Sequence, residues 1–189
     1  MDILLSSTLL VAFAEIGDKT MLLAILLAVR FRAPAAIIAG IFAATIVNHA
    51  IAAWAGSAIS GLLDGYWFRL AIAIGFLAMA VWTLIPDRLD EEDAVDKPPR
   101  HGVFLTTMIA FFLAEMGDKT QVATIALGAR YHAVGLVAMG TTLGMMIANV
   151  PAVLLGDRVT RLIPLRPMRI AAALIFAILG LLALRDLLG

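Results

Sequence analysis

The sequence predicts an all-α integral membrane protein whose six transmembrane helices form two inverted three-helix repeats. Three observations lead to this prediction: long apolar runs, a hexapeptide that recurs 100 residues later, and an odd number of runs in each copy. Of the 189 residues, 62% are hydrophobic and 15% are charged. Soluble proteins carry roughly a quarter charged residues, so a chain this apolar is expected to lie in a lipid bilayer.

Six apolar runs are each long enough to cross the hydrocarbon core, which takes about 20 residues of helix. They cover residues 3–29, 33–57, 66–85, 103–129, 133–157 and 167–187. The one long polar stretch, residues 86–101, combines an acidic run with prolines and is expected to be a solvated linker. The predicted division is residues 1–85 for the first three-helix repeat, 86–101 for an acidic cytoplasmic linker and 102–189 for the second repeat.

The two halves of the chain are copies of one another. The segment EIGDKT at residues 15–20 returns as EMGDKT at residues 115–120, and no gap is needed to align the flanking residues. Arginines and glycines recur at the same offset, as in Arg30 and Arg130 or Gly40 and Gly140. Because each copy contains three runs, the second copy must enter the membrane from the opposite side, which is the inverted topology of many secondary transporters.

The basic residues outside the two motifs predict the orientation. The loops after the first, third and fifth runs carry nine of them: Arg30, Arg32, Arg88, Lys97, Arg100, Arg158, Arg161, Arg166 and Arg169. The other side carries three: Arg69, Arg130 and Arg185. Cytoplasmic loops are enriched in Lys and Arg, so the linker is expected in the cytoplasm and both termini outside. The N-terminus lacks a basic region typical of a cleaved signal peptide, and the expected location is a bacterial inner membrane.

The duplicated motif places charged groups near the middle of the membrane, where each costs at least about 2.5 kcal/mol. Its carboxylates are Glu15, Asp18, Glu115 and Asp118. Residues three apart share a face of a helix, so we expect the repeat symmetry to bring all four together. Four negative charges and the two positive charges of Lys19 and Lys119 leave a charge of −2. One divalent cation or two protons would neutralise that charge, which motivates the hypothesis of metal–proton exchange.

Other polar groups of the same runs could complete an oxygen-rich metal site. The candidates are Thr20, Thr120, Gln121, Asn48, His49 and Asn149. Oxygen ligands suit Ca²⁺, Mn²⁺ or Mg²⁺, an imidazole shifts the preference slightly toward Mn²⁺, and a chain without cysteine has no thiolate site. The two lysines are expected to balance charge, because an ammonium group cannot act as a ligand. Met145 and Met146 are expected to be packing residues.

The glycine of each motif, Gly17 or Gly117, leaves two interpretations open. It could let neighbouring helices approach closely, or it could mark a local break that frees backbone carbonyl groups.

The twin motif resembles the signature E-x-G-D-[KR]-[ST] of the manganese/calcium cation–proton exchangers, a family that includes bacterial manganese exporters and the animal Golgi manganese transporter. The resemblance covers the whole chain. It implies that Glu15, Asp18, Glu115 and Asp118 are the transport-site carboxylates. It also implies Mn²⁺ or Ca²⁺ as the exported cation and protons as the counter-ions, with no cofactor beyond the transported cation. The expected partners are the bilayer, the cation and protons, and a homo-oligomer is left open.

Three alternatives are weighed against a cation transporter. A cationic amino-acid exporter also has about six spans, but it has little need for four central carboxylates. An intramembrane aspartyl protease shares the dipeptide Gly-Asp, but such enzymes use Gly-x-Gly-Asp, and Glu15 and Glu115 stand in the leading position here. A membrane assembly factor would tolerate amides in place of Glu15 and Asp18. A net charge of zero gives no indication of nucleic-acid binding.

Overall fold

The computed structural model describes residues 2–62, 65–85, 102–156 and 164–188, and these residues form helices and no strands. The helices are α1 (Ile3–Glu15), α2 (Lys19–Phe31), α3 (Pro34–Leu62), α4 (Tyr66–Trp82), α5 (Gly102–Glu115), α6 (Lys119–Tyr131), α7 (Val134–Leu155) and α9 (Leu165–Leu188). The all-α prediction is confirmed for these residues. The predicted linker 86–101 lies outside them.

Three helices, α3, α7 and α9, are long and apolar enough to cross a membrane by themselves. Helices α1, α4 and α5 are also apolar but shorter, with 13, 17 and 14 residues. The prediction of helices able to span a membrane is therefore confirmed for three of them. The full count of six spans remains a prediction.

The first apolar run of each repeat is broken in the middle. Helix α1 ends at Glu15 and α2 begins at Lys19, and the second repeat breaks between Glu115 and Lys119. The prediction that the glutamate and aspartate of one motif share a face of a continuous helix is wrong, because the chain turns between them. The local break, which the glycine left open, is confirmed.

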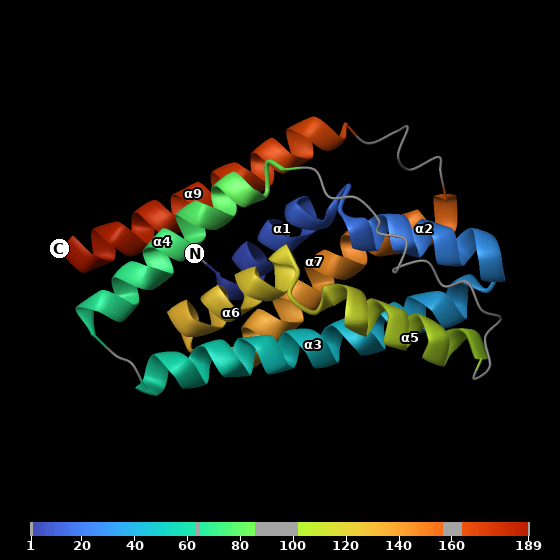
Figure 1. The fold of residues 1–189 in the computed structure, drawn as a ribbon, viewed down its shortest axis with the longest axis horizontal. Coiled ribbons are helices and arrows are strands. Elements are labelled where there is room, and N and C mark those ends of the chain that lie inside the picture. The colour runs from blue at the N-terminus through green and yellow to red at the C-terminus, as the bar shows by residue number, and fades with distance from the viewer. Residues whose placement is uncertain (1, 63–64, 86–101, 157–163, 189) are drawn as a thin grey trace.

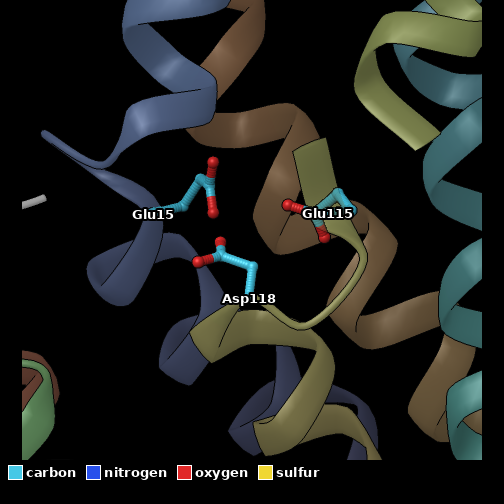
Figure 2. Close-up of side chains that lie close together, drawn as sticks. All are labelled: Glu15, Glu115 and Asp118. Atoms are coloured by element: carbon cyan, nitrogen blue, oxygen red, sulfur yellow. The ribbon is translucent and has the colours of Figure 1, made fainter. Parts of the chain in front are cut away.

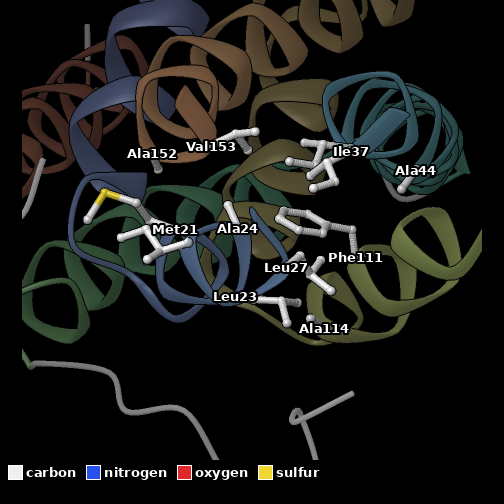
Figure 3. Close-up of a cluster of buried hydrophobic side chains, with 12 residues drawn as sticks. Met21, Leu23, Ala24, Leu27, Ile37, Ala44, Phe111, Ala114, Ala152 and Val153 are labelled. Atoms are coloured by element: carbon white, nitrogen blue, oxygen red, sulfur yellow. The ribbon is translucent and has the colours of Figure 1, made fainter. Parts of the chain in front are cut away.

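Figure 1 shows α4 and α9 side by side along one edge, and the other six helices form a bundle beside this pair. The rings of Phe76 in α4 and Phe176 in α9 lie with their centroids 6.5 Å apart. These two phenylalanines occupy equivalent positions in the repeats. In the bundle, a buried apolar cluster around Met21, Ile37 and Phe111 joins α2, α3 and α5 and includes residues of α7 (Figure 3).

Glycines let helices of different repeats approach backbone to backbone. A Cβ atom on Gly40 of α3 would lie 2.7 Å from the carbonyl oxygen of Phe104 in α5. A Cβ atom on Gly140 of α7 would lie 2.8 Å from the carbonyl oxygen of Leu4 in α1. Gly40 and Gly140 are equivalent, and so are Phe104 and Leu4. The same small-residue contact therefore forms twice, as is common between helices in membranes.

We expect Gly56→Val to destabilise the protein strongly. Gly56 is buried in α3, and any Cβ atom there would collide with the carbonyl oxygen of Ile125 in α6. Overpacking a tight interface costs typically about 1–3 kcal/mol, and a clash with backbone belongs at the upper end of that range. Thermal unfolding of the purified protein in detergent should show a clearly lower midpoint. The matched control is Gly61→Val near the end of the same helix, where a Cβ atom would meet no described residue within 4 Å. Equal midpoints for both variants would contradict the α3–α6 packing.

Candidate metal centre

Each motif folds into a tight turn that ends one helix and begins the next. The amide of Asp18 donates a hydrogen bond of 3.0 Å to the carbonyl oxygen of Glu15, which closes a four-residue turn. Ile16 has φ −64° and ψ 113°, and Gly17 has φ +84°. These angles match a type II turn, whose third position requires positive φ and therefore favours glycine. The second motif repeats the turn, with a hydrogen bond of 3.1 Å and a glycine φ of +80°.

The turns bring helix ends and carboxylates to the same place. Glu15 and Glu115 are the last residues of α1 and α5, while Asp18 and Asp118 stand at the N-caps of α2 and α6. The C-terminal end of a helix carries a partial negative charge of roughly half an electron. Because a glutamate stands at that end of both α1 and α5, negative charge accumulates there, and a bound cation would offset it. Broken helices supply cation sites in this way in several transporters.

Three of the four predicted carboxylates lie together. Glu15, Glu115 and Asp118 each offer an oxygen atom within 4.8 Å of the others, and Figure 2 shows the three side chains pointing toward one another. Glu15 and Glu115 are fully buried, and Asp118 is 6% exposed. Asp18 is not part of this group. Its Oδ1 lies 3.9 Å from Nζ of Lys119, so the motif lysine of the second repeat balances an aspartate of the first.

Each glutamate of the cluster contacts the long helix of the other repeat. Asn149 of α7 donates from Nδ2 to Oε1 of Glu15 at 3.4 Å. Nε2 of His49 in α3 lies 3.3 Å from Oε2 of Glu115. Because positions 49 and 149 are equivalent, these contacts are the same contact made twice. Both residues were candidate ligands, and the structure places both at the carboxylates.

The other candidate residues divide into those at the cluster and those that support it. Thr120 donates from Oγ1 to Oε2 of Glu115 at 3.1 Å. Gln121 accepts from the amide of Gly117 at 2.7 Å and donates to Oδ1 of Asn48, so its side chain ties the second turn to α3. Thr20 is buried, and Lys19 is half-buried and forms no ion pair with a described residue.

Several buried oxygen atoms at the cluster have no hydrogen-bond partner among the described residues. Oε2 of Glu15 and Oδ1 of Asn149 are among them. A buried acceptor without a donor costs about 1–3 kcal/mol, and such atoms are rare in folded proteins. A cation bound at the cluster would supply a partner for such atoms. The donor set of carboxylate and amide oxygens fits a hard divalent cation.

The two turns are covered differently. Over the first turn, Arg169 of α9 donates from Nη2 to the carbonyl oxygen of Gly17 at 3.2 Å, and a Cβ atom on Gly17 would collide with Leu165. In the second turn Met116 and Gly117 are exposed, and a Cβ atom on Gly117 would meet no atom of the described residues within 4 Å. Arg169 was predicted only as a marker of topology, because nothing in its spacing relates it to the motif.

Comparisons with known proteins identify a family of cation transporters. A family model described as "Divalent cation/proton antiporter GDT1" matches residues 3–91 and 103–189. A Vibrio cholerae serotype O1 protein named "Putative manganese exporter" is 48% identical over 96% of this chain and 90% of its own length. GDT1-like protein sll0615 of Synechocystis is 29% identical over 89% of each chain. GDT1-like protein 3 of Arabidopsis thaliana is 26% identical over 93% of this chain and 68% of its own. No solved structure matches.

Proposed function

We propose, from the premise that this chain belongs to the GDT1 family of divalent cation/proton antiporters, that it exports Mn²⁺ from the cytoplasm in exchange for protons. The chain is an integral membrane protein and a divalent cation transporter, not an enzyme. The observation that carries the proposal is the buried group of Glu15, Glu115 and Asp118 at two helix breaks. The name of the Vibrio cholerae relative favours Mn²⁺, and Ca²⁺ is the second candidate.

The proposed site couples the two ions through shared oxygen atoms. With Asp18 beside Lys119, the cluster of Glu15, Glu115 and Asp118 keeps three carboxylates. A divalent cation neutralises two of these charges, and in its absence two protons do so. Protons and cation then compete for the same atoms, which couples their movements without a second site. Asn149, His49 and Thr120 adjoin the carboxylates in the proposed site.

An inverted six-span architecture is part of the proposal. Three repeated contacts support it: the glycine contacts of α3 and α7, the contacts of His49 and Asn149 with the opposite glutamate, and the pairing of Phe76 with Phe176. The unequal covering of the two turns is what alternating access predicts, since the two repeats exchange conformations during transport. Parallel halves in an experimental structure would contradict this architecture.

The purified protein in liposomes gives a direct test of the function. We expect uptake of Mn²⁺ to exceed that of Ca²⁺, and Mg²⁺ to be slowest because it gives up its water ligands reluctantly. Lysine uptake measured in parallel tests the amino-acid exporter. Transport of lysine without any divalent cation would contradict the proposal.

The cytoplasmic position of the linker can be tested by labelling, because the chain has no cysteine of its own. We expect a cysteine at Ala94 to resist an impermeant thiol reagent added to intact cells and to react once the membrane is opened. Gly135→Cys, at the exposed start of α7, is the matched site on the predicted outer side and should react in intact cells. The reverse pattern would invert the predicted orientation.

A further inference from the structure

A sulfur atom lies at the edge of the proposed cation site. Met145 of α7 is fully buried, and its Sδ lies 2.9 Å from Nδ2 of Asn149. The same Nδ2 donates to Oε1 of Glu15 at 3.4 Å. The thioether of Met145 and the carboxylate of Glu15 therefore both accept from the side-chain amide of Asn149. Met145 is buried, in agreement with the expectation of a packing residue, and its sulfur in addition contacts a polar group of the proposed site.

A second thioether stands behind the first turn. The amide of Gly17 donates to Sδ of Met21 at 3.5 Å. Met21 is fully buried and belongs to the same apolar cluster as Ala152 of α7 (Figure 3). The turn that carries Glu15 is thus bordered by sulfur from α2 and from α7.

The second repeat has oxygen where the first turn has sulfur. Thr45 occupies the position equivalent to Met145, and Gln121 the position equivalent to Met21. The Gln121 side chain caps the amide of Gly117 through an oxygen atom, as Met21 caps Gly17 through sulfur. The amide of the turn glycine is therefore capped by a thioether on the side of Glu15 and by an oxygen atom on the side of Glu115.

We propose that Met145 is a selectivity-determining residue that favours Mn²⁺ over Ca²⁺ and Mg²⁺, an inference that rests on the proposed export of Mn²⁺. Ca²⁺ takes about 6–8 oxygen ligands, and Mg²⁺ requires a near-ideal shell of oxygen atoms. A thioether beside Asn149, which itself contacts Glu15, withholds an oxygen ligand from both ions. Mn²⁺ also prefers oxygen ligands, but as a first-row transition metal it tolerates a thioether neighbour better than Ca²⁺ or Mg²⁺ does. The unbranched methionine side chain can move toward a bound ion without a change in the backbone.

The experiment compares Mn²⁺ and Ca²⁺ uptake by full-length variants in liposomes. Met145→Leu removes the sulfur and nearly keeps the volume, and Met145→Thr introduces the residue found at position 45. We expect the ratio of Mn²⁺ to Ca²⁺ uptake to fall about tenfold in both, the factor that corresponds to about 1.4 kcal/mol. Met146→Leu and Met146→Thr are the controls, because Met146 is adjacent, half-buried and packs against the apolar cluster. Thermal midpoints confirm that the variants fold.

The outcomes separate this inference from the proposed function. Preference for Mn²⁺ in the wild type, with an unchanged ratio in the folded Met145→Leu variant, would overturn the role of Met145 and leave Mn²⁺ export standing. A wild type that carries Mn²⁺ and Ca²⁺ equally would overturn the selectivity itself. A wild type that moves neither ion would overturn the proposed function and this inference together. Should the threonine variant fail to fold, the leucine variant decides.

Discussion

The double variant Glu15→Gln/Glu115→Gln is expected to lose cation transport and to keep its fold. An amide preserves the shape of the side chain, but it removes the negative charge and one of the two oxygen ligands. Glu15 and Glu115 are fully buried in the proposed site. Removing a residue that only supports a metal ligand lowers metal affinity by up to about a hundredfold. Because Glu15 and Glu115 are themselves proposed ligands, we expect transport of Mn²⁺ to fall by more than that.

The measurement is Mn²⁺ flux into liposomes, with elution volume and thermal midpoint as tests of folding. Asp2→Asn is a matched control that also replaces a carboxylate by an amide. Asp2 is exposed and accepts from the amide of Leu4 at the start of α1, and asparagine caps helices as well as aspartate. Wild-type flux from the double variant would rule out the carboxylate cluster as the transport site. Loss of flux in the Asp2 control would show that the assay reports general damage.

A proton gradient that is acidic on the outer side is expected to drive Mn²⁺ out of the cytoplasm. Protons that bind the cluster from outside displace the cation there, and their release inside restores the negative site. One pH unit corresponds to about 1.4 kcal/mol per proton. If two protons move per cation, a gradient of one pH unit would therefore sustain a cation concentration ratio of about a hundredfold.

Everted membrane vesicles with an acidic lumen provide the measurement, since their lumen corresponds to the outer side. Mn²⁺ added to the medium should accumulate in the lumen and leak back when an ionophore that exchanges K⁺ for H⁺ collapses the pH gradient. Vesicles with Glu15→Gln/Glu115→Gln should not accumulate the ion. Accumulation that persists without a pH gradient would remove the proton coupling and leave cation transport intact.

The sequence sufficed for the all-α class and for most of the candidate site. Both rest on local information: apolar runs long enough for a bilayer, and a hexapeptide repeated without gaps. Charged groups placed deep in such runs need partners wherever they lie in the fold. For that reason Glu15, Glu115, Asp118 and Asn149 could be chosen without knowledge of any contact.

Only the tertiary structure decided how these residues meet. Apolar residues flank the charged motif on both sides within residues 3–29, so a single helix was expected, and the break depends on the backbone angles of Gly17. The ion pair of Asp18 with Lys119 joins residues about 100 positions apart. The contact of Met145 with Asn149 is local, but its place beside Glu15 depends on how α7 packs against α1. A sequence shows which groups must find partners in the membrane, and the packing of the helices selects those partners.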